Sequence, residues 1–469
     1  MFAQLRKRLT DLDAQITEQR RVLAELEQTR SDVERELHAI AYPVLTLPFE
    51  ITAEIFLRCR QLWGFAELYH RRTIDQNTTP IKLASVCRAW RDIILATPLL
   101  WSEVWVYFDA LPAELVSKPA VVEGDIDRWL IRAGGRPLTL YFECGKGEEA
   151  EDEEQDEPFA LGRLRDIIHR WSPQVQYLHL VIDRDIGPLG LESLQFPLLE
   201  SVALDCNYEA RVVDPHRRVF TNAPRFHDLR MGLPLAFTFP WSQLTKFQGE
   251  LWDVVLFTLA PNLCEVTCSF RPDDSDHLVV THRNLRSLTS HVTDILEYLT
   301  LPALQHLAVL YLSNHHSIVD FISRSSPPLI SLSVPGDHAG TSFNSWGQCV
   351  PRTLESLEIC EVSAAGLVDP SILDVLPNLR TLILKDVAGG FDFYFLVGYL
   401  YSRSNQLRTF KLVWQNNPFL DGKLYDGLPG EESYDTISGH LSRLAQSGMN
   451  IRLGTRDKRY FPIRDTAIV

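Results

Sequence analysis

Few of the reactive side chains in the sequence are spaced as a catalytic or metal site requires. Cys264 and Cys268 are four residues apart, but they fall in a segment with strand-like alternation, and no second cysteine pair or nearby histidine pair completes a zinc set. His315 and His316 are adjacent, and we expect them at the surface of a turn. The sequence has no glycine-rich phosphate loop and no G-x-S-x-G nucleophile turn. It therefore predicts no catalytic residue, no metal and no cofactor, so any associated chemistry would come from a partner.

Composition and charge limit the partners and the compartment. The 469 residues carry a formal net charge of −15 and 45% hydrophobic residues, which predicts a sizeable core and repulsion from nucleic acid and anionic membranes. No apolar run approaches the roughly 18 residues that span a bilayer, and the N-terminus lacks the apolar core of a secretion signal. Eight scattered cysteines fit reduced thiols better than a disulfide framework. We expect a cytoplasmic or nuclear protein that binds neither nucleic acid nor membrane.

The first 41 residues predict a long helix with a coiled-coil seam. Alternating steps of four and three residues from Leu5 to Ile40 meet an apolar side chain everywhere except at Gln19 and Arg30. A polar residue in such a seam can fix register or partner number. Residues 1–41 are therefore a candidate homo-oligomerisation helix, and the alternative is a helix that folds back on its own chain.

Residues 43–106 contain three groups of residues in the order of a known motif. The groups are L-P-x-E-I-x-x-x-I-F at 47–56, V-C-R-x-W-R at 86–91 and P-x-L-W at 98–101. This ordered pattern resembles the F-box, a domain of three short helices. The gap at 59–82 is longer than in an ordinary F-box and is interpreted as an insertion between helices, which costs little loop-closure entropy.

The resemblance implies a specific partner for these helices. So small a bundle cannot bury its own apolar face, and in the F-box family a Skp-type adaptor covers that face and links it to cullin and RING subunits. The resemblance implies ten residues that contact the adaptor or fill the domain core: Leu47, Pro48, Ile51, Ile55, Val86, Cys87, Trp90, Pro98, Leu100 and Trp101. The alternative is that Val86, Cys87 and Trp90 only fill an ordinary helical core.

The remainder of the chain repeats one short phrase. An apolar residue, two polar residues and then apolar-x-apolar recur eleven times, as in PNLRTLIL at 377–384, at intervals of 18 to 28 residues. Each phrase supplies alternating inward residues for a strand, and each unit covers its apolar flank only by stacking on a neighbour. Residues 137–142 add an expected first strand, and residues 431–453 add a last helix and strand.

This phrase resembles the degenerate leucine-rich repeats that follow F-boxes, notably in expanded fungal families. The resemblance implies an irregular leucine-rich-repeat solenoid over residues 121–455, and an ordinary α/β sandwich is the alternative. The predicted fold class is therefore α/β: a coiled-coil-like N-terminal helix, a three-helix F-box and a repeat solenoid. Residues 456–469 are expected to form a cap or a disordered tail.

An acidic block interrupts the repeats near their start. Eight of the ten residues from 148 to 157 are acidic, and such a block repels itself and buries little area. Residues 145–158 are therefore predicted to form a disordered loop. The loop is either a solvated insertion or a docking segment for a basic partner.

The resemblances together imply a substrate-recognition adaptor of a cullin-RING (SCF-type) ubiquitin ligase, a subunit with no catalysis of its own. The F-box would bind the Skp-type adaptor, and the repeats would bind an unidentified protein substrate on their extended surface. The outward strand positions expected to face that substrate are Asp228, Arg230, His306, Ser356, Glu358, Thr381, Thr409 and Lys411. The alternative is a scaffold protein that uses the F-box, heptad helix and repeats for protein interaction alone. An unrelated enzyme would need a catalytic site that the sequence lacks.

Overall fold

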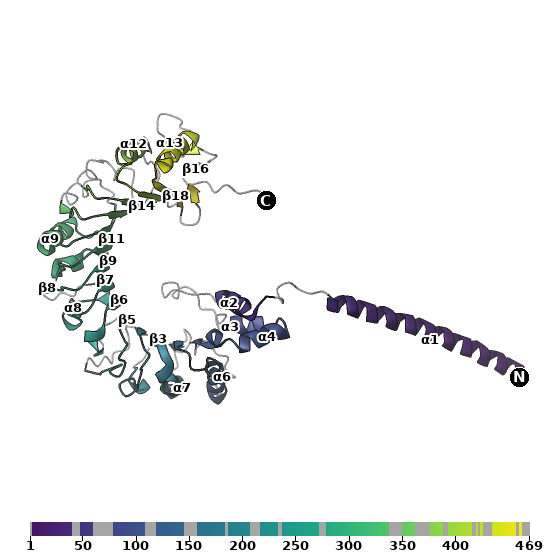
Figure 1. Ribbon diagram of the computed structural model, residues 1–469. Helices are drawn as coiled ribbons and strands as arrows, with labels where there is room; N and C mark the ends of the chain where they lie inside the picture. Colours follow the sequence, from purple (N-terminus) through teal and green to yellow (C-terminus); the bar gives the residue numbers. More distant parts are fainter. Residues whose placement is uncertain are drawn as a thin grey trace. The chain divides into compact units, whose positions relative to one another are not determined.

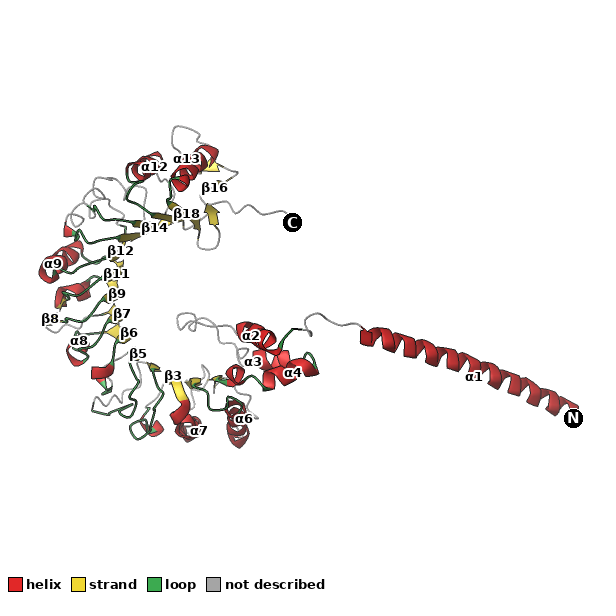
Figure 2. Ribbon diagram, in the orientation of Figure 1, coloured by secondary structure: helices red, strands yellow, loops and turns green. Residues whose placement is uncertain are grey.

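A computed structural model shows a mixed α/β protein with a long N-terminal helix and a large parallel sheet, which confirms that part of the predicted fold (Figures 1 and 2). The chain divides into two compact units, a first unit of residues 1–103 and 129–136 and a second unit of residues 104–128 and 137–469. None of the described helices is long and apolar enough to cross a membrane. The structure describes residues 2–39, 47–59, 78–107, 119–144, 157–182, 186–206, 216–232, 237–271, 278–336, 349–361, 376–387, 393–414, 419–420, 423–424, 434–455 and 459–461.

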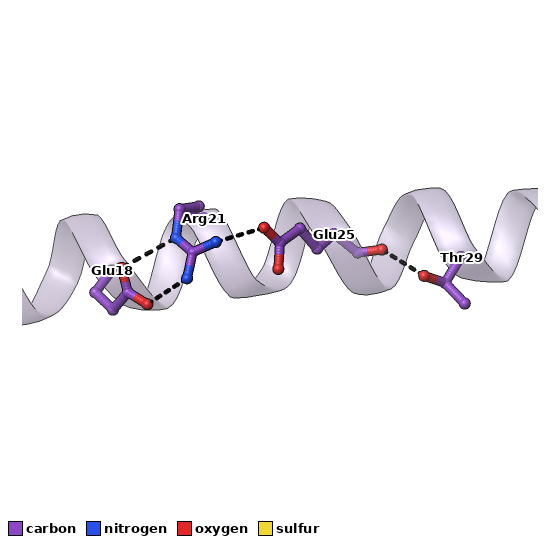
Figure 3. Close-up of polar contacts among 4 residues, drawn as sticks. All are labelled: Glu18, Arg21, Glu25 and Thr29. Carbon is purple, nitrogen blue, oxygen red and sulfur yellow. Dashed lines mark hydrogen bonds and ion pairs between the residues drawn. The ribbon is translucent and has the colours of Figure 1, made fainter.

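The first helix, α1 (Phe2–Ala39), forms where the heptad pattern predicts it. It contains no glycine or proline, the residues that most disfavour a helix interior. Exposed ion pairs run along it: the Arg21 guanidinium lies 2.6 Å from the Glu18 carboxylate and 2.5 Å from that of Glu25 (Figure 3). The hydrogen bond from Arg21 also holds the pKa of Glu18 below its usual value. These contacts stabilise the helix but leave its apolar stripe uncovered.

The first unit also contains a group of short helices, here called the short-helix cluster: α2 (Phe49–Cys59), α3 (Thr78–Ala84), α4 (Arg88–Leu95) and the 3-10 helix η4 (Pro98–Trp101). Phe56 and Ile94 are buried in its core, and the Phe56 ring meets Trp90 edge-on at 4.9 Å. Cys87 caps α4, because its sulfur accepts a hydrogen bond from the Trp90 N–H at 3.5 Å. Pro98 opens η4, where its missing N–H costs little.

The second unit is built on one sheet whose strands follow each other in chain order. Its described part has 15 strands, ordered β1-β2-β3-β4-β5-β6-β7-β9-β11-β12-β13-β14-β15-β18-β19. All neighbours from β2 to β18 are parallel, and β19 pairs with β18 antiparallel. The strands are β1 (Glu103–Tyr107), β2 (Leu138–Cys144), β3 (Val175–Ile182), β4 (Ser201–Cys206), β5 (Asp228–Met231), β6 (Lys246–Leu251), β7 (Glu265–Phe270), β9 (Ser287–Val292), β11 (His306–Tyr311), β12 (Ser331–Pro335), β13 (Ser356–Cys360), β14 (Thr381–Val387), β15 (Thr409–Trp414), β18 (Asn450–Thr455) and β19 (Arg459–Phe461).

Shorter elements complete the second unit. Two further strand pairs are β8 (Val280–Thr281) with β10 (Leu299–Thr300), and β16 (Phe419–Leu420) with β17 (Lys423–Leu424). The helices are α6 (Pro119–Ile131), whose end belongs to the first unit, α7 (Glu157–Trp171), α8 (Leu256–Leu259), α9 (His315–Ser325), α12 (Phe393–Ser402) and α13 (Tyr434–Gln446), and the 3-10 helices are η6 (Ser172–Gln174), η7 (Gly187–Leu189), η9 (Trp241–Gln243) and η10 (Asp294–Tyr298). Figure 2 shows α7, α8, α9 and α12 on one side of the sheet strands.

The repeated phrase accounts for the sheet. Each of the eleven phrases ends in one of the strands β3 to β15, which confirms the strands that the pattern predicts. Strand pairing aligns the central apolar residue of every phrase into one row, and every member of the row is buried: Leu178, Val202, Leu229, Phe247, Val266, Leu288, Leu307, Leu332, Leu357, Leu382 and Phe410. A core of this kind extends along the sheet because each strand covers its neighbour.

Side-chain amides tie neighbouring repeats together just before some strands. Each of these asparagines donates a hydrogen bond of 2.7 to 2.9 Å to a backbone carbonyl of the preceding repeat: Asn262 to Ser242, Asn284 to Pro261 and Asn378 to Arg352. They stand directly before the leading leucine of their phrases. The bonds satisfy carbonyls at the turn and fix the spacing of adjacent units.

Three places near the ends of the sheet add to the sequence expectation or differ from it. Residues 145–156 of the expected acidic loop lie outside the described residues, but residues 157–158 open helix α7 instead, where an acidic side chain favours a helix N-terminus. Strand β19 forms within the expected tail 456–469 and covers one edge of β18. Strand β1, which no phrase predicts, flanks β2. The expected first strand, and the expected last helix and strand, are confirmed as β2, α13 and β18.

Candidate functional site

The structure divides the ten predicted adaptor-contact residues between the surface and the core of the short-helix cluster. Leu47, Pro48, Ile51, Ile55 and Val86 are exposed, with exposed fractions that reach 50% for Ile51 and 61% for Val86. Ile51 and Ile55 are one turn apart on α2, so their side chains share one face of that helix. These five residues are free to contact another protein directly.

The other five predicted residues lie deeper. Cys87, Trp90 and Pro98 are half-buried, while Leu100 and Trp101 are buried, with 1% and 3% exposed. The Trp101 ring donates from Nε1 to the Ile94 carbonyl at 2.9 Å. Leu100 and Trp101 therefore support the surface from beneath and do not form part of it.

Two side chains from the end of α6 enclose the Trp101 ring. Trp129 meets it edge-on at 4.6 Å, and the Arg132 guanidinium lies 4.7 Å above its centre. Trp129 also donates from Nε1 to the Glu103 carbonyl at 3.0 Å. Side chains more than 20 residues beyond the motif thus complete the core of this cluster, which motif spacing alone does not reveal.

The cluster exposes further large apolar side chains that motif matching did not select. Phe49, Ile81, Leu95 and Leu99 have between 44% and 55% of their surface exposed. They occupy variable positions of the motif or lie outside it, so only their apolar character could have signalled them. Single exposed apolar residues are common, but this many on so small a group of helices is typical of a protein-binding surface.

The eight predicted substrate-facing residues all lie in two outward rows of the sheet, which alternate with the buried rows. Asp228, His306, Ser356, Thr381 and Thr409 belong to a polar row that strand pairing traces from Tyr177 to Asn450. Arg230, Glu358 and Lys411 belong to the neighbouring row, which runs from Tyr141 to Arg452. Because parallel pairing keeps the rows in register, the residues share one face.

Charges on this face are partly paired within the chain. Asp228, Lys246 and Glu265 are consecutive members of the polar row, and Lys246 Nζ lies 3.1 Å from Glu265. Burial raises the pKa of Asp228, and a hydrogen bond from Ser201 and the charge of Lys246 oppose that shift. This part of the face offers alternating charges to a ligand.

Glu358, in contrast, is already held by neighbouring side chains. Its carboxylate accepts a hydrogen bond from Ser333 at 3.1 Å and pairs with Lys385 Nζ at 2.8 Å. A ligand that binds Glu358 would have to share it with Lys385. The structure therefore places this predicted residue on the outward face but gives it a structural role there.

An aromatic and acidic cluster near the start of the sheet was not predicted. Trp105 stacks on Tyr141 at 4.4 Å, and Tyr107 lies 5.4 Å from the same ring. His179 meets Tyr141 edge-on at 4.7 Å and hydrogen bonds Asp205 through Nε2 at 2.9 Å. Burial raises the pKa of Tyr107 to about 12 and that of Tyr141 further, so both phenols stay neutral.

The signal for this aromatic cluster lies in the alternation of β2 and β3. Tyr141 and His179 stand between buried residues of their strands, so the same rule that selects the other outward positions places them in the second outward row. Tyr141 also donates to Glu143 at 2.7 Å. The cluster makes one end of the outward face bulky and rigid, in contrast to the small Ser and Thr residues farther along.

Neither cysteines nor histidines gather into a catalytic or metal site in the described part of the chain. Cys268 is buried, Cys264 is half-buried, and burial raises the pKa of Cys268 to about 12. Among the described residues, no group of three or more His, Cys, Asp or Glu side chains lies together as a metal ion requires. The two surfaces above are therefore the candidate sites.

Comparison with known proteins adds no family to this description. No model of a known protein family matches the chain, and no curated protein matches it.

Proposed function

We propose that this chain is a substrate-recognition adaptor of a cullin-RING ubiquitin ligase. Its short-helix cluster would act as an F-box that binds a Skp-type adaptor subunit, and its strand repeats would act as a leucine-rich-repeat solenoid that binds a protein substrate. The observation that carries the proposal is the row of exposed motif residues on α2, with Ile51 at 50% and Ile55 at 42% exposed.

Physical chemistry supports a partner for this surface. When a partner covers exposed Leu, Ile and Val side chains, the complex is stabilised by roughly 25 cal/mol for each Å² of apolar surface removed from water. The cluster is too small to cover them itself, because its core already uses Phe56, Ile94, Leu100 and Trp101. A Skp-type subunit, the partner implied by the order of the motif, would supply the missing cover.

The outward face of the sheet supports the second half of the proposal. Its polar row is composed of Ser, Thr, Asn, His, Tyr and charged residues, so a substrate would be bound by hydrogen bonds and charge pairs. The alternating charges at Asp228, Lys246 and Glu265 favour a substrate segment that carries both signs of charge.

The test measures binding of the full chain to a purified Skp-type adaptor by calorimetry. The double variant Ile51→Asp/Ile55→Asp puts two charges on the proposed contact face, and we expect at least about a 100-fold loss of affinity. The matched control Leu278→Asp/Val279→Asp makes the same change at two exposed residues of the second unit, and it should bind as the unchanged chain does. Equal binding by both variants would refute the proposed contact.

A second measurement separates a ligase subunit from a scaffold. The exposed apolar stripe of α1 favours the scaffold alternative, because an assembly protein needs a further interaction surface. Addition of purified cullin to the complex with the Skp-type adaptor should give a stable ternary complex if the chain is a ligase subunit. A complex that binds the adaptor but excludes cullin would favour the scaffold.

A further inference from the structure

The apolar stripe of α1 is bare in the single chain. The described seam residues have between 47% and 62% of their surface exposed: Leu5, Leu9, Leu12, Ile16, Leu23, Leu26 and Val33. Gln19 and Arg30 interrupt the stripe at equal distances from a point between residues 24 and 25. Since the helix is about 57 Å long, this stripe exposes a large apolar surface to water. A second helix packed along the stripe would bury that surface best.

The two polar seam residues distinguish between possible partners. A parallel pair of α1 helices in register would place Arg30 beside Arg30, which sets like charges against each other in the seam. An antiparallel pair centred between residues 24 and 25 would place Gln19 opposite Arg30 of the second copy, at both ends. The Gln19 side-chain oxygen can accept from a guanidinium that has five N–H donors and uses one on Glu34, at 2.9 Å.

The same antiparallel alignment also matches the apolar positions. It places Leu23 opposite Leu26 of the second copy at the centre, and Ile16 opposite Val33 on either side. From residue 16 to residue 33, each apolar seam side chain therefore meets an apolar side chain, and each polar seam residue meets its complement. Shifting the alignment by one heptad sets Arg30 against leucine and leaves its charge without a polar neighbour across the seam.

Arg20 and Glu27, which lie beside the seam, meet opposite charges only in the antiparallel orientation. Arg20 and Glu27 follow seam positions directly, so they flank the contact, and the antiparallel alignment places Arg20 opposite Glu27 of the second copy. In a parallel pair the flanking positions opposite Arg20 and Glu27 are Gln15 and Val22, which carry no charge. The intrahelical ion pairs described for α1 use other residues, so both charges remain available.

Asp13 opposes this alignment at both ends of the dimer. Asp13 would approach Glu34 of the second copy, and the two carboxylates repel each other. Arg30 offsets this repulsion because its guanidinium already pairs with Glu34. A parallel pair would instead place Asp13 opposite Arg8 of the second copy, so the flanking charges alone do not decide the direction. The Gln19–Arg30 layers decide it, because a parallel pair sets Arg30 against Arg30.

We propose that α1 binds α1 of a second copy of this chain as an antiparallel coiled coil, with Gln19 opposite Arg30 and Arg20 opposite Glu27. The Gln19–Arg30 layers fix both the register and the direction. This dimer is independent of the adaptor surface proposed above, because it uses a different helix.

Charge reversal in the full chain tests the direction and register together. Sedimentation equilibrium of the unchanged chain should give a dimer, and both Arg20→Glu and Glu27→Arg should weaken that dimer about tenfold, because each creates two like-charge contacts. The double variant Arg20→Glu/Glu27→Arg should restore the original affinity. The matched control Lys7→Glu reverses one charge on the outer side of the helix and should dimerise as the unchanged chain does.

Mixing the two single variants gives a second readout. A tagged Arg20→Glu chain should capture an untagged Glu27→Arg chain about as well as unchanged chains capture each other, because both contacts between positions 20 and 27 then join opposite charges. A monomeric unchanged chain would overturn the proposal, as would a dimer that none of these charge reversals weakens. Weakening without rescue in the double variant or in the mixture would also refute it.

Discussion

His282 joins neighbouring repeats through both of its ring nitrogens, and its removal tests how the stacked sheet is held together. Nδ1 accepts a hydrogen bond from the Leu285 N–H at 3.1 Å, so the ring proton lies on Nε2, which donates to the Ala260 carbonyl at 3.1 Å. The residue is 3% exposed, and its ring lies 6.1 Å from that of Phe257. A neutral imidazole in this single tautomer satisfies two buried backbone groups.

The size of the effect follows from those two bonds. His282→Ala removes both, and each is worth about 1 kcal/mol net. Leu285 and Ala260 are fully buried, so the N–H and carbonyl left behind lose a partner that water replaces poorly. With the void left by the ring, we expect His282→Ala to lower the free energy of unfolding by about 3 kcal/mol.

The effect depends on pH in a defined direction. Burial lowers the pKa of His282 below its ordinary value of 6.5, and the hydrogen bond to Ala260 opposes part of that shift. The unfolded chain therefore binds a proton near pH 6.5 while the folded chain does not, so stability falls as pH decreases from 6.5 towards the folded pKa. More than about one pH unit above 6.5, the residue adds no pH dependence. At pH 5.5 this loss cannot exceed about 1.4 kcal/mol.

Urea unfolding of the full chain at pH 7.5 and pH 5.5 measures both quantities. The stability gap between the unchanged chain and His282→Ala should be about 3 kcal/mol at pH 7.5 and smaller at pH 5.5, because only the unchanged chain pays the protonation penalty. His316→Ala, at an exposed position of α9, should change neither value. A gap below about 1 kcal/mol at pH 7.5, or a gap that is equal at both pH values, would refute the assigned tautomer and burial.

Two further predictions concern the packing of the sheet. A Cβ at Gly249 would overlap the Met231 carbonyl of the adjacent strand, so Gly249→Ala should lower the free energy of unfolding in urea by about 2 kcal/mol. The control Gly232→Ala adds a Cβ that meets nothing within 4 Å, and it should leave that free energy unchanged. Equal urea midpoints for the two variants would contradict the close approach at Gly249. Iodoacetamide at pH 8 should label exposed Cys59 and spare Cys268, whose thiol pKa burial raises to about 12. Equal labelling by mass spectrometry would show that Cys268 is accessible.

The strands were predictable because each repeat carries the same physical requirement. A strand in a parallel sheet must bury every second side chain, so an L-x-L pair such as Leu382 and Leu384 marks the strand, its register and its outward positions together. Eleven repetitions average out irregular members such as β6, where Gly249 occupies a position that is Met231 in β5 and Cys268 in β7. The outward position of Thr381 follows directly from the buried residue that succeeds it.

The aromatic cluster and the last strand were less accessible to sequence reasoning. Trp105 and Tyr141 are separated by segments that no repeat phrase covers, and only the pairing of β1 with β2 brings them together. Strand β19 is three residues long, too short for alternation to indicate it, and it forms because the exposed edge of β18 offers unpaired backbone groups. In both cases strand pairing, and not a local sequence pattern, determines the structure.

The short-helix cluster shows why a motif identifies a surface without separating its contacts from its core. The same sequence pattern fits an apolar side chain that fills the core and one that contacts a partner. Both kinds of side chain are buried from water once the partner is bound. Trp101 and Ile51 are equally good motif matches, yet one is 3% exposed and the other 50%. Loss of adaptor binding by Trp101→Ala would therefore report only on folding. The same loss by Ile51→Asp, with helical content unchanged by circular dichroism, would report on contact.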